Sequence, residues 1–284
     1  MDAGRGEPRG YVSGETVAVL LPESGRFSAA AEAVRAGILA AQRADDPSKR
    51  PVLRFYDTSN DQSAPALVRR AAAEGAQLVI GPLQKQAVDQ LAASPSLPAP
   101  TLALNVATGG QMPPPDLYQF ALSPEDEAVA VANKAWANGY RRVLMLYPEG
   151  PWGSRLARGF RQQWTTLGGR VAAGQAYDPA ANDFSESIER LLGAEGTDSG
   201  QGPDADFIFL VATAQKAGEI WPQIRAAAGP NVPPVFCTSH IHSTQFNVQG
   251  NQNLAGLYFV DIPWLIAPNP GDPLSIQNVG RDLP

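Results

Sequence analysis

The stretch VAVLLPESGRFSAAAEAVRAG, from Val17 to Gly37, decides the fold class of this chain. Its apolar start, Val17–Leu21, predicts a buried strand, and the residues after the Ser24-Gly25 turn predict a helix with one apolar face. That face is formed by residues spaced three or four apart: Ala30, Val34, Ile38 and Ala41. A buried strand that leads into a one-sided helix is the repeating unit of a parallel sheet, so we predict a β-α-β fold.

The same alternation continues along the chain as far as the run PVFCT at 234–238. Because parallel strands need crossovers of about a dozen residues, usually helical, these segments predict open, doubly wound sheets. The further strands are predicted at 52–58, 78–81, 101–105, 142–147, 170–177, 207–212 and 234–238, and the helices at 65–74, 84–92, 127–138, 153–167, 184–192 and from Ala214. Pro222 is expected to break or kink the last of these helices, and the polar stretch 196–205 is predicted to be a surface loop.

A boundary between two lobes is predicted just before Ser123. The preceding stretch is rich in proline and glycine, and Ser123-Pro124-Glu125-Asp126 combines an N-cap serine, a first-turn proline and two acids, which together indicate a helix start. We therefore predict a two-lobed α/β fold, each lobe a mainly parallel sheet flanked by helices. Lobe 1 covers 16–122, lobe 2 covers 123–265, and 266–284 is a tail or the start of a return to lobe 1.

Composition excludes several classes of partner. The 22 basic and 28 acidic residues give a net charge of −6, and the short cluster Arg69-Arg70 is predicted to be a solvated helix face, so we expect no nucleic-acid partner. No apolar run approaches the roughly 20 residues of a membrane span. Cys237 is the single cysteine and lies in an apolar run, so a buried structural thiol is predicted.

The motifs of common enzymes are missing from the sequence. It contains neither GxGxxG nor GxxxxGK[ST], and no GxSxG elbow. His240 and His242 are its two histidines, and no cysteine, aspartate or glutamate stands beside them to complete a metal site. We therefore predict no catalytic residue, no metal and no cofactor. If the protein were an enzyme, Glu149 and Asp57 would be the only plausible proton carriers.

Polar residues follow many of the predicted strands, where open parallel sheets bind their ligands. They suit a small polar molecule, although serine, threonine and aspartate also cap helices whatever the function, and Trp152 could equally cover a neighbouring helix. For Ser24-Gly25 a helix cap and a ligand contact are both open, and we favour a turn at the rim of a cleft without phosphate chemistry. The candidate ligand-binding residues are Ser24, Gly25, Arg26, Asp57, Gly81, Leu83, Asn105, Ala107, Glu149, Trp152, Thr213 and Ser239.

Several segments stand in an order that resembles a known family. They include LVIGPLQKQAVDQLA at 78–92, YQFALSPEDEA at 118–128 and LYFVDIPWL at 257–265. From about Thr16 to Leu265 the chain resembles the carboxyl-terminal domain of the penicillin-binding protein activator family, the LpoA/LppC-like proteins. The resemblance implies the type 1 periplasmic binding protein fold. It also implies a non-enzymatic activator that stimulates peptidoglycan synthesis by contact with a class A penicillin-binding protein, in the periplasm, on an outer-membrane lipoprotein.

The resemblance leaves an alternative, a solute-binding receptor for an amino acid or small polar ligand of an ABC transporter. In amino-acid receptors of this fold, residues after GPL and after TLALN hold the ligand carboxylate, and an acid after the PVFCT strand holds the amine. Here TSHIHS follows that strand without an acid, so receptor-like amino-acid binding is not expected. The family also implies a helical-repeat domain and a lipid-modified cysteine that this sequence lacks, and a longer return to lobe 1, so the fold is expected to be incomplete at its carboxyl end.

Overall fold

The computed structural model describes residues 14–60, 63–110, 112–193, 205–242 and 253–279. The predicted loop at 196–205 lies outside these residues except for Ala205. The described chain forms two compact α/β units. The first unit holds the described residues up to Leu122 together with those from Ala267 onward, and the second unit is the continuous stretch Ser123–Ile266. No helix in the described ranges is long and apolar enough to cross a membrane.

The first unit is built on a five-stranded parallel sheet with the order β2-β1-β3-β4-β5. Its strands are β1 (Thr16–Leu21), β2 (Val52–Asp57), β3 (Ala76–Ile80), β4 (Thr101–Ala103) and β5 (Leu117–Gln119). β1 is buried from Val17 to Leu21, in agreement with the apolar run that predicted it. The chain reverses its direction of winding between β1 and β3, and ligands of such sheets bind at that point.

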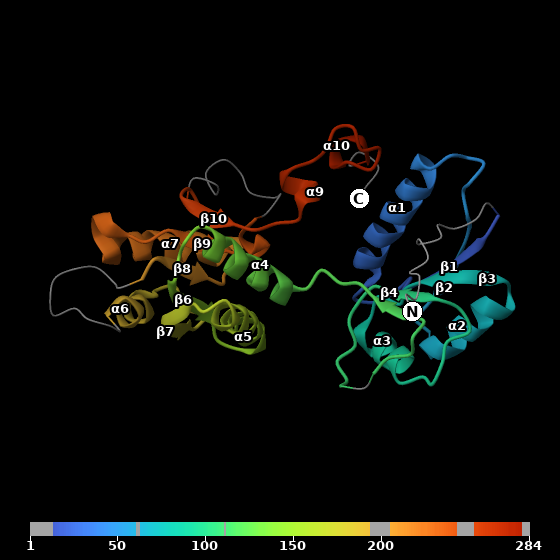
Figure 1. Ribbon diagram of the computed structural model, residues 1–284, viewed down its shortest axis with the longest axis horizontal. Coiled ribbons are helices and arrows are strands. Elements are labelled where there is room, and N and C mark those ends of the chain that lie inside the picture. Colours follow the sequence, from blue (N-terminus) through green and yellow to red (C-terminus); the bar gives the residue numbers. More distant parts are fainter. Residues whose placement is uncertain (1–13, 61–62, 111, 194–204, 243–252, 280–284) are drawn as a thin grey trace, which may run out of the picture. The chain divides into compact units, whose positions relative to one another are not determined.

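Helices cover both faces of this sheet (Figure 1). α1 (Ser28–Ala44) packs on one face, while α2 (Ala64–Ala73) and α3 (Lys85–Ala92) pack on the other. Val34 and Ile38 pack against this core as predicted, whereas Ala31 and Ala40 are buried in place of the predicted Ala30 and Ala41, which are exposed. A short helix, α10 (Ile276–Val279), follows the buried Ser275 near the end of the described chain.

The second unit repeats this design. Its five parallel strands have the order β10-β9-β8-β6-β7, which is the order of the first sheet when the strands are counted from β6. The strands are β6 (Arg142–Pro148), β7 (Arg170–Tyr177), β8 (Phe207–Leu210), β9 (Val235–Cys237) and β10 (Leu257–Phe259). Cys237 is fully buried, which confirms the predicted structural thiol.

Two helices cover each face of the second sheet. α4 (Pro124–Ala137) and α5 (Pro151–Thr166) pack on one face through a core that stacks Phe160 on Phe209, with ring centroids 4.2 Å apart. α6 (Ser185–Gly193) and α7 (Ala214–Ala228) pack on the other face. Short helical turns η2 (Gly229–Asn231) and η3 (Ser239–Ile241) flank β9, and α9 (Pro263–Ile266) follows β10.

Pro222 does not break α7, so that prediction is wrong in this respect: the helix runs unbroken from Ala214 to Ala228. Proline removes one backbone hydrogen bond and crowds the preceding turn. Here Ile220, Trp221 and Ile224 are all buried in the core and hold the helix on both sides of the proline. Packing of these side chains in the core therefore outweighs the tendency of proline to break a helix.

The fold class predicted from the sequence is confirmed, and two strands were missed. β5 and β10 each have three residues and lie at the edge of their sheets. β5 follows a run of three prolines, Pro113–Pro115, in the stretch interpreted as a connection. β4 and β9 are equally short but mostly buried, whereas β5 has one buried residue and β10 has none. No buried apolar run therefore marks β5 and β10, and only their pairing with β4 and β9 reveals them.

Candidate functional site

The turn after β1 is held by the loop after β2. The backbone N–H of Ser24 donates to Ser59 Oγ at 2.9 Å, and the carbonyl of Gly25 accepts from the N–H of Ser28 at 3.1 Å. Gly25 has a φ of 79°, a conformation that suits glycine. The N-cap of α1 is Phe27, so Ser24 does not cap this helix. Ser24 and Gly25 are left as parts of an exposed turn at the carboxyl end of the sheet.

Asp57 fixes this turn from the end of β2. One of its carboxylate oxygens, Oδ1, accepts the N–H groups of Glu23 at 2.9 Å and Ser59 at 2.8 Å. Burial raises the pKa of Asp57, but the hydrogen bonds from Glu23 and Ser59 outweigh it and hold the pKa below its usual value. The carboxylate is therefore kept ionised as a structural acceptor between two loops.

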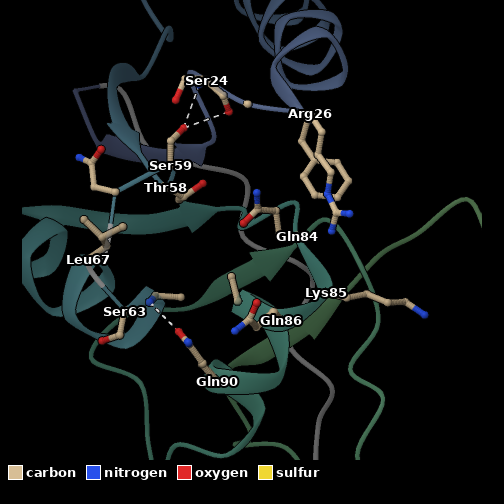
Figure 2. A pocket seen from close by; sticks show the side chains of 15 residues that line it. Ser24, Arg26, Thr58, Ser59, Ser63, Leu67, Gln84, Lys85, Gln86 and Gln90 are labelled. Atoms are coloured by element: carbon tan, nitrogen blue, oxygen red, sulfur yellow. Dashed lines mark hydrogen bonds between the residues drawn. The ribbon is translucent and has the colours of Figure 1, made fainter.

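A pocket of about 740 Å³ opens beside this turn (Figure 2). It lies at the carboxyl ends of β1 and β2, against the first turns of α2 and α3. Three of the predicted ligand residues line it, Ser24, Gly25 and Arg26. The other lining residues were not among the candidate ligand-binding residues, although Thr58 follows a predicted strand; they are Phe27, Thr58, Ser59, Asn60, Ser63, Ala64, Leu67, Gln84, Lys85, Gln86, Ala87 and Gln90.

The two predicted ligand residues after β3, Gly81 and Leu83, are held by contacts within the protein. Gly81 is buried, has a φ of 101°, and a Cβ at its position would overlap the carbonyl oxygen of Leu20 on β1. Leu83 packs against the core on the α1 face, and its carbonyl accepts from Asn105 Nδ2 at 3.0 Å. Neither residue lines the pocket beside Ser24.

Asn105 and Ala107 follow β4 and also lie outside this pocket. Asn105 is occupied in joining the β3 and β4 loops, since its Oδ1 accepts from the N–H of Val106 at 3.0 Å while its amide donates to Leu83. The N–H of Ala107 donates to Gln119 Oε1 on β5 at 2.6 Å. Of the predicted ligand residues of this unit, only Ser24, Gly25 and Arg26, in the turn after β1, line the pocket.

In the second unit, Trp152 and Ser239 meet around His240. The ring centroids of Trp152 and His240 are 5.1 Å apart, and His240 Nδ1 lies 3.2 Å from Thr238 Oγ1. Ser239 donates its N–H to Glu127 Oε2 at 2.8 Å, and the same oxygen lies 3.8 Å from His240 Nδ1. An acid therefore does stand at the end of β9, but α4 supplies it, far away in the sequence.

The remaining candidates of the second unit are separate from this cluster. Thr213 is the N-cap of α7, and its Oγ1 accepts from the N–H of Lys216 at 3.4 Å, so the capping alternative holds for it. Glu149 is exposed after β6, and its N–H donates to the carbonyl of Tyr177 at 2.8 Å. Neither residue lines a pocket described in this unit.

The two histidines have different partners. His240, in η3, lies near Glu127, whereas His242 Nδ1 lies 2.9 Å from Asp261 Oδ2. Neither acid is a sequence neighbour of the histidines, so neither partner was predicted. Within the described ranges no group of three or more histidine, cysteine, aspartate or glutamate side chains could hold a metal ion. Each histidine is thus paired with a single carboxylate.

Two parallel sheets of identical strand order, with polar loops at their carboxyl ends, define the class of type 1 periplasmic-binding-protein-like chains. The chain matches the family described as "LppC putative lipoprotein" over residues 12–279, and it belongs to that family. Curated relatives carry the name penicillin-binding protein activator LpoA. The one from Serratia proteamaculans is 31% identical over 77% of this chain and 36% of its own length. The one from Edwardsiella piscicida is 34% identical over 77% of this chain and 35% of its own.

Solved structures agree with this assignment of the fold. The C-domain of Haemophilus influenzae LpoA, described as a regulator of PBP1A, has a TM-score of 0.72 and 24% identity over 94% of this chain and 79% of its own. A putative branched-chain amino acid ABC transporter from Chromobacterium violaceum has a TM-score of 0.72 and 28% identity over 95% of this chain and 79% of its own. The chain spans less than half the length of the curated activators it matches.

Proposed function

We propose that this chain is a non-enzymatic activator of peptidoglycan synthesis that acts by contact with a class A penicillin-binding protein. The observation that carries the proposal is its family membership, together with 31% and 34% identity to proteins named as penicillin-binding protein activators. These relatives favour the activator over a transporter receptor. A place in the periplasm, on an outer-membrane lipoprotein, is part of the same proposal and rests on the lipoprotein family.

The polar groups at the strand ends support a role without chemistry. Asp57 accepts two backbone N–H groups, Thr213 caps α7, and Asn105 ties two loops together. A general base needs hydrogen-bond reach to the proton that it takes. The hydrogen bonds of Asp57, Thr213 and Asn105 instead go to the backbone of this chain and hold its loops and helix ends in place. Such fixed loops suit a surface that recognises another protein.

The outer face of α5 supports recognition of another protein. Leu156, Phe160 and Trp164 bury its inner face, so the outward residues are held in place. Arg155, which pairs with Glu125 at 3.1 Å, and Arg158 line a groove of about 430 Å³ beside α4. Arginine is enriched at protein interfaces because its guanidinium combines apolar contact with several donors.

The test is a titration of a purified class A penicillin-binding protein with this chain, read as binding and as the rate of peptidoglycan polymerisation and cross-linking. We expect saturable binding and a higher rate. Arg158→Glu should weaken binding about tenfold, because it reverses an exposed charge on the proposed contact face. Arg69→Glu, an exposed arginine on α2 away from the groove, is the matched control. No binding by the folded chain would contradict the proposal.

A further inference from the structure

β2 forms one edge of the first sheet, and half of its backbone groups point away from that sheet. In a parallel pair of strands, alternate residues bond to the neighbouring strand. The N–H of Val52 donates to the carbonyl of Glu15 at 2.9 Å, so the even-numbered residues of β2 face β1. The backbone N–H and C=O groups of Leu53, Phe55 and Asp57 therefore face outward, and they bond to no residue that the structure describes.

The other edges of the two sheets are short or already occupied. β5 and β10 have three residues each. β7 has eight, but its pairing with β6 shifts register between Val143 and Leu144. One carbonyl of β7, that of Ala176, already accepts from the side chains of Gln175 and Ser187. β2 pairs with β1 over six residues without a shift, so it lacks the short length and the bulges that protect natural edges from added strands.

A groove of about 570 Å³ lies along this edge. Residues 54–57 of β2 line it, and its other walls come from the loops after β1 and β2 and from α2 with its C-cap residue. Phe55 packs in the core on the α1 face and Tyr56 in the core on the α2 face, so a groove that touches both lies over the strand edge itself. Four consecutive strand residues span about 10 Å, which is room for about four residues of an added extended segment.

Side chains on both flanks of the groove are held in place by one another. On the α2 flank, the hydroxyl of Tyr56 donates to Glu74 Oε2 at 2.8 Å, and Arg70 Nε lies 2.8 Å from Glu74 Oε1. On the α1 flank, Arg35 pairs with Glu23 at 3.0 Å. Because these walls are already fixed, little conformational entropy of the protein is lost when a segment enters the groove.

The charges that line the groove have a direction along β2. Arg54 is exposed near the start of the strand, and its guanidinium donates to a neutral group, the carbonyl of Glu74, at 2.7 Å. At the other end of the strand lie the carboxylates of Glu23 and Asp57, and Asp57 forms no ion pair with a described residue. This polarity favours a segment with an acid beside Arg54 and a base beside Asp57.

We propose that an extended segment of a partner protein adds to the first sheet as a further strand beside β2. Its backbone pairs with the outward groups of Leu53, Phe55 and Asp57, and its side chains alternate between the two flanks. It carries an acid and a base three positions apart, because Arg54 and Asp57 are three residues apart on β2.

A second copy of this chain does not match these charges. Residues that face each other across a pair of strands lie on the same face of the sheet, whereas Arg54 and Asp57 lie on opposite faces of β2. Two paired β2 strands would therefore leave both charges without their opposite. The groove belongs to the first unit, and α4 and α5 belong to the second, so the added strand and the proposed synthase contact can each be lost without the other.

The experiment is a two-dimensional amide NMR titration of the whole chain with the peptide acetyl-Thr-Glu-Val-Thr-Lys-Val-amide and with the same sequence reversed, which test the two strand directions. We expect one of them to bind saturably, at about millimolar Kd or tighter, and to shift the amide signals of Leu53, Phe55 and Asp57. Hydrogen exchange of these three amides should slow. The amides of Arg54 and Tyr56, which already face β1, should change less.

The control is the binding peptide methylated on every backbone nitrogen, which has no N–H to donate. No shift with either peptide, equal shifts with the methylated peptide, or shifts confined to β5, β7 or β10 would overturn the proposal. Light scattering that finds a dimer of the chain alone, with slow exchange at Leu53 and Phe55 before peptide is added, would overturn it in favour of a second copy.

Variants separate backbone pairing from packing and charge. Leu53→Pro removes one outward N–H, which an edge strand tolerates, and should raise the Kd about tenfold, whereas Leu53→Ala loses similar packing but keeps the N–H and should bind nearly as the parent does. Equal Kd values for these two variants would overturn the backbone pairing. If Leu53→Pro does not fold, the exchange pattern of the parent and the methylated peptide decide.

The charge of Arg54 is tested separately. Arg54→Gln keeps a donor for the Glu74 carbonyl but removes the charge, so it should raise the Kd about twofold to fivefold. Arg69→Gln, an exposed arginine of α2 outside the groove, should leave the Kd unchanged. Equal effects of Arg54→Gln and Arg69→Gln would overturn the placement of the acid beside Arg54.

Discussion

Glu127 Oε2 accepts the backbone N–H of Ser239 at 2.8 Å, which joins two residues 112 positions apart in the chain. This contact fixes the loop after β9 to the first turn of α4. It is half-buried, so its loss leaves a backbone donor without a comparable partner.

Glu127→Ala should therefore destabilise the second unit by about 1–2 kcal/mol, while Glu127→Gln, which keeps an acceptor oxygen, should cost less. Urea unfolding followed by tryptophan fluorescence measures this unit, because all 5 tryptophans of the chain lie between residues 136 and 264. Asp126→Ala, an exposed acid of the same helix turn, is the control for the helix-dipole effect. Equal losses in Glu127→Ala and Asp126→Ala would contradict the role of the hydrogen bond.

Gly81 is predicted to be required for folding of the first unit. An alanine there would combine a positive φ with an overlap on the Leu20 carbonyl, and the expected loss is about 3 kcal/mol or more. Gly75 has a φ of 94° with nothing near its missing Cβ, so Gly75→Ala should cost only about 1 kcal/mol. Hydrogen exchange of the β1 amides measures both variants, and similar losses would rule out the close contact as the cause.

The stability of the first unit should fall in acid partly through Asp57. Its pKa is lower in the folded protein than in the unfolded chain, so its contribution is present above the unfolded value of about 3.9 and is lost as the pH falls through the lower folded value. Asp57→Asn, which cannot ionise, should show a smaller dependence of unfolding free energy on pH between about 5 and 2. An NMR titration that finds the Asp57 carboxyl at or above its usual pKa would disprove this.

Cys237 should be unreactive in the native protein. It is fully buried, and burial raises the pKa of its thiol, so little thiolate forms and no reagent reaches it. A thiol-specific chromogenic reagent should label one equivalent per chain in denaturant and almost none without it, because the chain has 1 cysteine. Rapid labelling under native conditions would show that β9 opens locally.

Pro222→Ala should stabilise α7. The substitution restores an N–H that can donate to the carbonyl of Gly218, and the exposed position gives the new side chain room. We expect a gain of about 1 kcal/mol in the free energy of unfolding, measured by urea titration. A loss instead would mean that α7 has adjusted its path to the proline.

Strands with a buried apolar run and helices with a regular apolar spacing could be predicted from the sequence, and short strands with exposed side chains could not. Val17–Leu21 and Arg170–Tyr177 match β1 and β7 within a residue, since their pattern is local. β5 and β10 exist because a neighbouring strand pairs with them. On α1, Val34 and Ile38 were predicted correctly, but Ala31 and Ala40 rather than Ala30 and Ala41 are buried, because alanine-rich helices give a weak apolar stripe.

The candidate site was predicted in part. The position of a turn after a strand can be inferred from sequence, and Ser24, Gly25 and Arg26 do line a pocket; that they bind a ligand stays a prediction. The opposite wall comes from α3, and the unpaired hydroxyl of Thr58 is visible only in three dimensions. Glu127 was missed for the same reason, since no sequence pattern connects α4 with the end of β9.

The second unit is one uninterrupted stretch, Ser123–Ile266, whereas the first is assembled from segments on both sides of it. During synthesis the ribosome therefore releases every residue of the second unit before Ala267 and the buried Ser275 reach the first. Domains fold as units in order of their completion. The unit completed later is thus the one that begins at the amino terminus. A nascent chain that has emerged from the ribosome as far as about residue 270 should hold a folded second unit and an incomplete first unit.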